Sequence, residues 1–257
     1  MYPYLLQIGS FQLPSFGVLL ALGFLGSMLA LRQDLRRRSF DTSLAETLAL
    51  AAMVGGLIGA KVYYLFEVWP YFLQDPVGTL FSGAGFTFYG GLAGGTIGVL
   101  RIIHRQNLPT WTIIDAVALS LPVGYAIGRI GCQLAGDGDY GTPTDLPWGM
   151  AYPDGLVPTM ERVHPTPVYE TLQSFLVFGV LLKLRSQFHH PGQLFCVYLI
   201  LTGLARFWVE YIRLNLDILW GLSDAQIISV LLVAGGTIGL WRLSQKAMQS
   251  VQTVVRN

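Results

Sequence analysis

Long apolar windows separated by short polar segments dominate this chain. A transmembrane helix needs about 20 consecutive, mostly apolar residues, and windows near that length recur along the sequence. Each window is expected to be helical because lipid offers the backbone no hydrogen-bond partners. We therefore predict an all-α polytopic membrane protein with about seven transmembrane helices. The predicted windows are residues 14–31, 43–66, 85–103, 112–128, 167–184, 193–213 and 224–243. Residues 67–84, with Pro70, Pro76 and paired aromatics, are interpreted as a segment at the membrane interface.

Composition supports a membrane protein. Hydrophobic residues make up 53% of the 257 positions and charged residues only 12%, whereas a soluble domain carries roughly 25% charged residues. We expect residues 1–257 to form a single integral membrane domain, with an extracytoplasmic loop region around 129–166. The net charge of +1 gives no reason to expect a nucleic-acid partner. Cys132 and Cys196 are predicted near opposite membrane faces, so no disulfide is expected.

The basic residues predict the orientation. Eleven of the 16 Lys and Arg residues follow alternate windows, which makes those connections cytoplasmic by the positive-inside rule. The N-terminus is therefore expected outside and the C-terminus in the cytoplasm. The eleven residues are Arg32, Arg36, Arg37, Arg38, Arg101, Arg105, Lys183, Arg185, Arg242, Lys246 and Arg256.

Charged residues inside or at the ends of apolar windows mark candidate chemistry. Arg206, Glu210 and Arg213 are spaced i, i+4 and i+7, so they are predicted to share one face of the sixth helix. Such charges normally face a partner or a wet cavity. Two interpretations remain: an internal ion pair that fastens helices, or a net positive site for an anion, since arginine matches phosphate geometrically.

The stretch GRIGCQLAGDGDYG, residues 128–141, ends the fourth window with polar chemistry. Gly128 and Gly131 flank Arg129, and glycines permit close approach of a backbone to a ligand. Asp137 and Asp139 are expected either to orient arginines, to act as a base, or simply to form a turn.

Two further groups extend the candidate set. The glycine pairs of the second and third windows, such as Gly55/Gly59 and Gly90/Gly94, are predicted to pack helices closely. Tyr89 lies near the start of the third window, where its hydroxyl would either join an interfacial aromatic belt or reach a site. The segment HPTPVYE opens the fifth window, and its His164 and Glu170 are either catalytic or tie the loop to helix ends.

Several of these blocks, in order and spacing, resemble the bacterial phosphatidylglycerol–prolipoprotein diacylglyceryl transferases. The blocks are GRIGC, GDYGTPTDLPWGMAYP, HPTPVYE and YLILTGLARFWVEYIR, with Asp115, Gln226 and Ser229 at matching places. Tyr140 and Gly141 belong to the second block. The resemblance covers nearly the whole chain.

The resemblance implies a seven-helix enzyme of the bacterial inner membrane. Such enzymes move the diacylglyceryl group of phosphatidylglycerol onto the lipobox cysteine of a prolipoprotein signal peptide and release glycerol phosphate. Arg129 would hold the lipid phosphate. The predicted substrate-binding residues are Arg129, Gly128, Gly131, Tyr140, Gly141, His164 and Arg213; the predicted catalytic residues are Arg206, Glu210, Tyr89, Asp137 and Asp139.

The chain departs from the family pattern at several polar positions. Cys132, Gln133 and Ala135 replace residues of the usual GR-x-GNF-x-NGE signature, Tyr89 replaces a histidine, and Thr202 and Phe16 replace tyrosines. Asp137 or Asp139 then supplies the signature's acid. The identity of the catalytic base stays open among Glu210, Asp137, Asp139 and a network through Tyr89.

Other functions are compatible with parts of the pattern. A transporter or flippase for an anionic lipid or solute would use the same arginines, but no internal repeat is visible. A paralogue of the transferases acting on another acceptor is a further alternative. An intramembrane aspartyl protease needs two aspartates from separate helices, whereas Asp137 and Asp139 share one loop. No cofactor or metal is predicted, because the histidines do not converge with a cysteine at ligand spacing.

Overall fold

The computed structural model describes residues 1–9, 11–82, 87–188, 190–213 and 221–256, and each predicted window coincides with one long helix. The helices are α1 (Ser15–Arg37), α2 (Leu44–Glu67), α3 (Trp69–Gln74), α4 (Pro76–Phe81), α5 (Phe88–Arg105), α6 (Thr110–Ala135), α7 (Thr166–Leu184), α8 (Gln193–Glu210) and α9 (Asp224–Arg256). Five of them, α1, α2, α6, α8 and α9 as far as Lys246, are long and apolar enough to cross a membrane. The chain is therefore a multi-pass helical membrane protein, while seven crossings and the orientation of the termini stay predictions.

Two helix boundaries differ from the predicted ones and change the setting of the candidate residues. Helix α6 continues to Ala135 instead of ending at 128, so Arg129 and Cys132 lie within its last turns. Helix α8 ends at Glu210, so Arg213 follows the helix instead of sharing its final turn. Residues 85 and 86, at the start of the third predicted window, lie outside the described residues.

The predicted interfacial segment forms the two short helices α3 and α4. Each has a proline in its first turn, where the missing N–H costs no helical hydrogen bond. Trp69, Tyr71 and Phe81 are exposed along them. Aromatic side chains of this kind are typical of membrane interfaces, and the location of α3 and α4 at an interface stays a prediction.

Two β-hairpins accompany the helices, which the all-α prediction did not include. Strands β1 (Tyr4–Ile8) and β2 (Phe11–Pro14) pair antiparallel near the N-terminus. Strands β3 (Met150–Tyr152) and β4 (Thr159–Val163) pair antiparallel in the long connection after α6. Strands this short carry too few positions for their alternation to stand out from the sequence.

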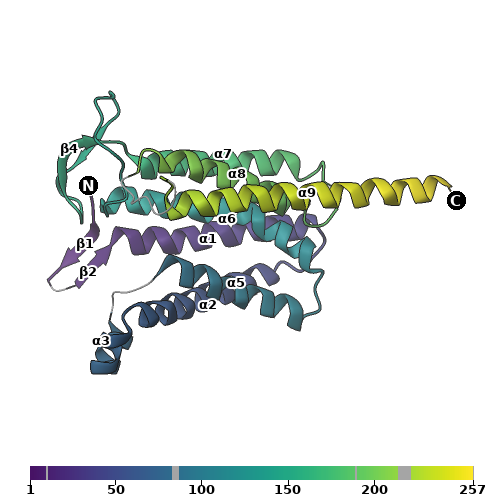
Figure 1. The fold of residues 1–257 in the computed structure, drawn as a ribbon. Coiled ribbons are helices and arrows are strands. Elements are labelled where there is room, and N and C mark those ends of the chain that lie inside the picture. The colour runs from purple at the N-terminus through teal and green to yellow at the C-terminus, as the bar shows by residue number, and fades with distance from the viewer. Residues whose placement is uncertain (10, 83–86, 189, 214–220, 257) are drawn as a thin grey trace. The chain divides into compact units, whose positions relative to one another are not determined.

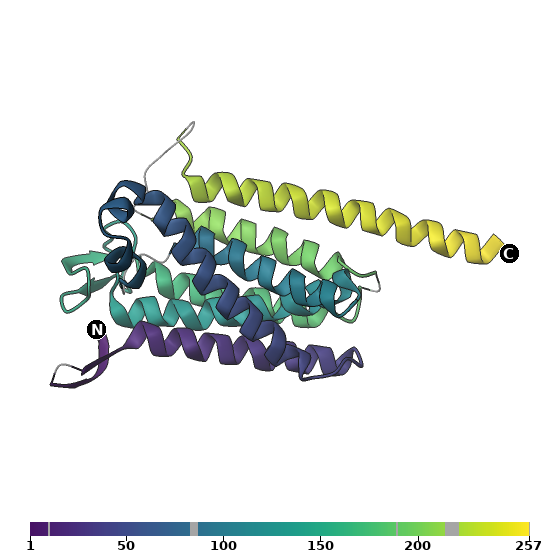
Figure 2. The ribbon, with the colours of Figure 1, turned by 90° about the horizontal axis from the view of Figure 1, so that it is seen from below.

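The chain forms two compact units. The larger contains residues 1–30 and 114–257, and the smaller contains residues 31–113. In the larger unit, α6, α7, α8 and α9 lie side by side (Figure 1), and α9 extends past its neighbours toward the C-terminus (Figure 2). The expectation of a single membrane domain stays a prediction.

A buried carboxylate fixes the start of α8 in the larger unit. Asp115 on α6 is 3% exposed and accepts hydrogen bonds from the backbone N–H groups of Gly192 and Phe195, each at 2.8 Å. The first N–H groups of a helix have no partner within it, and they favour an anion. Asp115 therefore joins α6 to α8 at the end of the helices opposite to Arg129 and Glu210.

The smaller unit depends on glycines where α2 meets α5. A Cβ at Gly94 would clash with the carbonyl oxygen of Gly55 and lie 2.9 Å from the Cα of Gly59. Cβ atoms at Gly59 and Gly98 would likewise clash with backbone of the facing helix. The predicted small-residue packing is confirmed: the two backbones approach so closely that side chains are excluded between them.

We expect Gly94→Ala to destabilise the protein by about 1–3 kcal/mol, because the added methyl group must push α2 and α5 apart. Gly91→Ala is the matched control on the same helix, since its Cβ would lie 3.6 Å from its nearest neighbours, an ordinary contact. Thermal unfolding of the two purified variants in detergent measures the difference. Equal melting temperatures would contradict the close-packing argument.

Candidate functional site

Three arginines and three carboxylates meet at one end of the larger unit. Arg129 comes from α6, Arg206 from α8 and Arg213 from the turn after α8. Their partners are Asp139 in the connection after α6, Glu170 on α7 and Glu210 on α8. We call these six residues the arginine–carboxylate cluster.

Glu170 is the centre of the cluster. Its carboxylate pairs with Arg129, with Arg206 at 2.8 Å and with Arg213 at 3.4 Å. Tyr125 donates a hydrogen bond to the same carboxylate at 2.8 Å, and its ring lies beneath the Arg129 guanidinium. With a side chain only 3% exposed, Glu170 holds three cations from separate segments around one buried anion.

Glu210 anchors the cluster to α9. It pairs with Arg206 one helical turn earlier at 2.8 Å, and it accepts a hydrogen bond from Ser223, just before α9, at 2.8 Å. The predicted shared face of Arg206 and Glu210 is confirmed. Arg213 reaches the same carboxylate from beyond the helix end, with its Nε 3.9 Å away.

Asp139 closes the cluster from the loop side. One of its carboxylate oxygens pairs with Arg129 and the other with Arg213 at 2.7 Å. Thr166, at the start of α7, donates its hydroxyl hydrogen to the Asp139 carbonyl. The side chain of Asp139 is 35% exposed, far more than those of Glu170 and Glu210.

Backbone pairing explains why Asp139 and Arg213 meet. Gly141 forms a β-bridge with Arg213, and Thr142 N–H donates to the Ile212 carbonyl at 2.8 Å. On its other side, Gly141 N–H donates to the His164 carbonyl at 2.9 Å. A Cβ at Gly141 would clash with the Ile212 carbonyl oxygen, so only glycine lets these segments approach.

The cluster is formally neutral, with three positive and three negative side chains. This differs from the expected net positive stripe, because Glu170 and Asp139 arrive from segments that the spacing on α8 does not reveal. Buried ions are tolerated where each is paired. The ion-pair interpretation therefore describes the structure as it stands, and an anionic ligand must enter by exchanging with one of the carboxylates or by adding negative charge.

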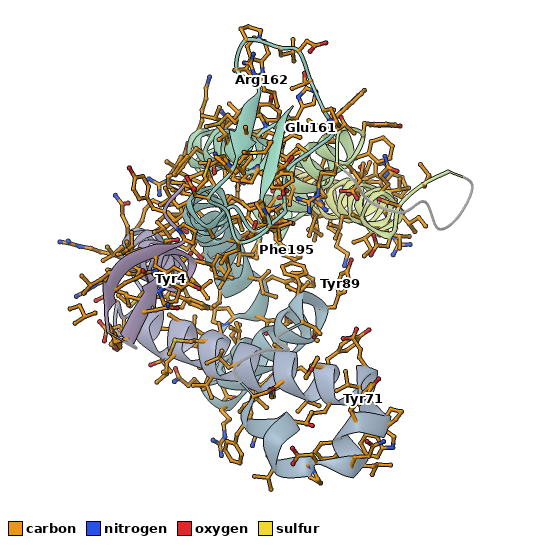
Figure 3. All side chains as sticks on the ribbon, turned by 90° about the vertical axis from the view of Figure 1, so that its left-hand side faces the viewer. Tyr4, Tyr71, Tyr89, Glu161, Arg162 and Phe195 are labelled. Carbon is orange, nitrogen blue, oxygen red and sulfur yellow. The ribbon has the colours of Figure 1, made fainter. Side chains whose placement is uncertain are left out.

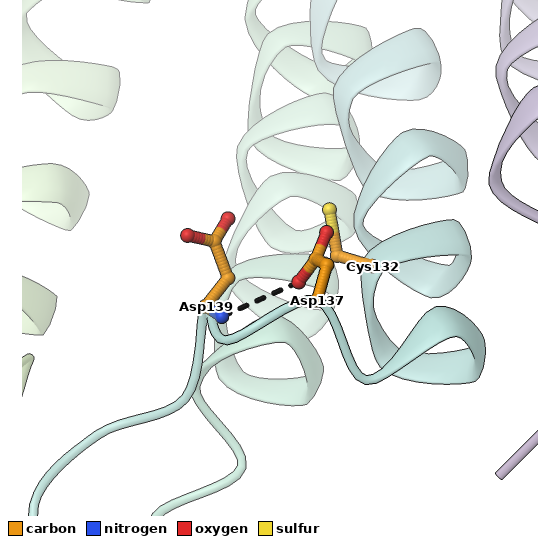
Figure 4. A group of neighbouring side chains, drawn as sticks. All are labelled: Cys132, Asp137 and Asp139. Carbon is orange, nitrogen blue, oxygen red and sulfur yellow. Dashed lines mark hydrogen bonds between the residues drawn. The ribbon is translucent and has the colours of Figure 1, made fainter. Parts of the chain in front are cut away.

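A second small group lies beside the cluster. Cys132, Asp137 and Asp139 bring a sulfur and carboxylate oxygens within 4.8 Å of one another, and Asp139 N–H donates to Asp137 at 3.3 Å (Figure 4). Asp139 already binds two arginines. Arg129 also approaches the Cys132 sulfur at 3.5 Å. Because these guanidinium groups would repel a cation, we assign no metal to this group.

The pKa values of the two loop aspartates, Asp137 and Asp139, are shifted in opposite directions. Burial raises the pKa of the Asp137 carboxyl, and the charge of neighbouring Asp139 adds to the effect. Burial opposes ionisation of Asp139 as well, but Arg129 and Arg213 outweigh it and lower the pKa of that carboxyl. Asp139 is therefore a poor proton acceptor, and Asp137 is the better one.

Several predicted binding residues make structural contacts in the described chain. The Tyr140 ring stacks on the buried Tyr152 ring, with centroids 4.8 Å apart. Gly131 faces α1, where a Cβ would lie 3.0 Å from Leu19. Gly141 and His164 hold the loop through backbone pairing, and the His164 ring lies 3.2 Å from the Tyr169 hydroxyl. Their roles in substrate binding stay predictions.

The remaining predicted residues are placed as follows. Gly128 has no described atom within 4 Å of the position where a Cβ would be, so its surface is open beside Arg129. Tyr89 belongs to the smaller unit, where it is 42% exposed and makes an edge contact with Phe88 (Figure 3). Its predicted catalytic role stays a prediction. The predicted absence of a disulfide is confirmed, since Cys132 and Cys196 are both free and buried.

The sequence does not single out Glu170 or Tyr125. The pattern leaves open whether Glu170 is catalytic or ties the loop to helix ends, and it gives no indication of Tyr125, which contacts Glu170 and Arg129. Glu170 carries a usable signal, because an acid five residues inside a membrane helix needs a partner. Tyr125 gives no such signal in the sequence. A tyrosine four residues before Arg129 indicates a contact only when Glu170 is already known to face α6.

An apolar groove begins close to the cluster. It is an open groove between α7 and α8 with a volume of about 230 Å³, lined by Gln173, Leu176, Val177, Val180, Leu201 and Ala205. Gln173 lies one helical turn from Glu170, and Ala205 precedes Arg206. Charged and apolar surfaces are thus adjacent, as an amphipathic ligand requires.

The fold and this site define a multi-pass membrane protein with buried and half-buried arginines next to an apolar groove. The family model described as prolipoprotein diacylglyceryl transferase matches residues 3–242. The chain belongs to this family.

Curated relatives extend over almost the same length. The chain is 34% identical to the phosphatidylglycerol–prolipoprotein diacylglyceryl transferase of Thermosynechococcus vestitus, over 93% of this chain and 91% of the relative. It is 33% identical to that of Clostridioides difficile, over 92% and 93%. It is 30% identical to that of Prochlorococcus marinus, over 98% and 94%. The matches therefore cover both the cluster and the smaller unit.

We expect Glu170→Gln to destabilise the protein by about 3–5 kcal/mol, because an amide of similar size leaves buried arginines without their shared anion. Glu161→Gln is the matched control, since Glu161 is exposed on β4 (Figure 3). Thermal unfolding in detergent compares the variants. A melting temperature for Glu170→Gln equal to that of Glu161→Gln would remove Glu170 from its central role.

Asp137→Asn is expected to stabilise the protein at neutral pH. A carboxyl whose folded pKa is raised favours folding only while protonated, so wild-type stability falls as pH rises from the unfolded value of about 3.8 through the folded value. Asparagine removes that penalty and keeps the oxygen that accepts the Asp139 N–H. Melting temperatures measured across pH should show a gain at neutral pH that disappears in acid. The matched control is Asp154→Asn, at an exposed aspartate of the same connection, and an equal gain in that variant would contradict the burial argument.

Proposed function

We propose that this protein transfers the diacylglyceryl group of phosphatidylglycerol to the thiol of a lipobox cysteine in a prolipoprotein signal peptide. Family membership and the relatives' names favour this activity over a transporter, a flippase or a paralogue with another acceptor. The structural observation that most supports this proposal is the convergence of Arg129, Arg206 and Arg213 beside an apolar groove. We place the protein in the bacterial inner membrane, with the cluster toward the outer leaflet.

The reaction forms one bond and breaks one. The cysteine sulfur attacks the carbon of the diacylglyceryl group that is bonded to the phosphate oxygen, and a carbon–sulfur thioether bond forms. The carbon–oxygen bond to phosphate breaks, and its electron pair stays on the phosphate oxygen. Glycerol phosphate leaves, and the thiol proton passes to a base. The chemical demands are a thiolate, since a free cysteine has a pKa of about 8.5, and stabilisation of charge on the leaving phosphate.

The arginines meet the second demand. A phosphate oxygen gains negative charge as its bond to carbon breaks, so guanidinium groups directed at it bind the transition state more tightly than the substrate. Arg129 is held between Asp139 and Glu170, and Arg206 between Glu170 and Glu210. These fixed partners pre-orient both guanidinium groups before the lipid arrives.

Asp137 is the best candidate for the base. Its raised pKa makes it a stronger proton acceptor than Asp139, whose carboxylate is committed to two arginines. Glu210 is committed to Arg206 and to the Ser223 hydroxyl. Asp137 is therefore the candidate base of the larger unit that both lies beside the cluster and has a raised pKa.

The groove between α7 and α8 supplies a place for an acyl chain. Its lining is apolar apart from Gln173, which lies one helical turn after Glu170, and it includes Ala205, which precedes Arg206. A phospholipid with its phosphate at the arginines would extend its hydrocarbon along this surface, which buries apolar area on both partners.

Arg129→Lys is expected to lower the transfer rate by about 100–1,000-fold, because lysine keeps the charge but loses the fork of donors that matches phosphate. The assay mixes purified protein, phosphatidylglycerol and a lipobox peptide, and mass spectrometry detects the added diacylglyceryl group. Arg101→Lys, at an exposed position on α5, should keep the full rate. Full turnover by a folded Arg129→Lys variant would refute the phosphate assignment.

A further inference from the structure

Asp139 differs from the other two carboxylates of the cluster. Glu170 and Glu210 project from helices and have side chains 3% and 1% exposed, whereas Asp139 lies in a loop and its side chain is 35% exposed. Glu170 and Glu210 are also held by hydroxyl groups, from Tyr125 and Ser223. Asp139 is therefore the carboxylate of the cluster that can leave by a side-chain rotation alone.

The position of the Asp139 carboxylate suits a phosphodiester equally well. Its two oxygens bridge Arg129 and Arg213, one oxygen to each guanidinium group. A lipid phosphodiester is also a monoanion with two terminal oxygens, and arginine pairs with both kinds of group in the same geometry. The buried Nε–H group of Arg129 has no hydrogen-bond partner among the described residues, which leaves a donor for a larger anion, whereas the Arg213 Nε lies 3.9 Å from the Glu210 carboxylate.

Charge balance favours exchange over addition. The cluster holds three guanidinium groups and three carboxylates, so a lipid phosphate that simply joined it would leave one uncompensated negative charge in a poorly hydrated site. Replacing one monoanion by another keeps the cluster neutral. The lowered pKa of Asp139 means that at neutral pH the group to be replaced is the charged carboxylate.

We propose that Asp139 is a built-in competitor of the substrate: its carboxylate occupies the phosphate position between Arg129 and Arg213, and lipid binding displaces it. This inference rests on the proposed function for the identity of the phosphate. Asp139 is thus a positioning residue that keeps the arginines paired when the site holds no lipid.

The same competition assists product release. The transfer converts a phosphodiester with one negative charge into glycerol phosphate, a monoester that carries about −1.5 to −2 near neutral pH. The extra charge would hold the product on the arginines. Return of the Asp139 carboxylate between Arg129 and Arg213 replaces those contacts as the product leaves.

The test uses Asp139→Asn in the full-length protein in detergent, with Asp145→Asn as the control in the same connection, where Asp145 is exposed. We expect Asp139→Asn to bind glycerol phosphate about tenfold more tightly in isothermal titration, since an amide competes poorly for guanidinium groups. In the transfer assay its KM for phosphatidylglycerol should fall while kcat does not rise. Asp145→Asn should match wild type in all three quantities.

Distinct outcomes separate the two proposals. A folded Asp139→Asn variant that binds glycerol phosphate no more tightly than wild type overturns the competitor role. Tighter binding without diacylglyceryl transfer by wild type supports the competitor role and refutes the proposed function. If Asp139→Asn does not fold, Thr166→Val removes the hydroxyl that holds the Asp139 carbonyl, and it should tighten glycerol phosphate binding in the same direction; unchanged or weaker binding by that variant also overturns the proposal.

Discussion

The pairing of one buried carboxylate, Glu170, with guanidinium groups from three segments is the interaction on which the site depends. Each of these ions would be expensive to bury alone, and together they form a neutral group that the helices can enclose. Glu170 sets the positions of Arg129 and Arg206, and Asp139 adds Arg213 from the loop side. Removing the central anion would leave the phosphate-binding groups without a fixed geometry.

Most of the helical architecture follows from the sequence, because apolar length and glycine spacing are local properties. Every predicted window contains a helix, and the pairs around Gly59 and Gly94 do pack backbone to backbone. The helix ends around Arg129 and Arg213 were harder to predict from the sequence, because tertiary pairing decides where α6 and α8 stop. The short hairpins were missed because strands of three to five residues carry too few positions for an alternating pattern to stand out.

The candidate site was only partly predictable. Arg206 and Glu210 share a face at i, i+4 spacing, and that geometry required nothing beyond one helix. The neutrality of the cluster could not be predicted, because it depends on two long-range contacts: Glu170 faces α6, and the Gly141 backbone pairs with Arg213. Tyr140 and Gly131, which are predicted to bind substrate, make packing contacts that the sequence blocks do not reveal, and their binding roles stay predictions.

The distribution of charges among successive helices bears on how the chain enters the bilayer. A lone charge at the centre of an inserting helix costs about 2.5–3.5 kcal/mol. Arg129 on α6 and Glu170 on the next helix, α7, form an ion pair near the helix ends, while α8 carries Arg206 and Glu210 one turn apart. Each of these four ions thus has a partner on the same helix or on the next long helix of the chain, so its compensation does not depend on a distant segment.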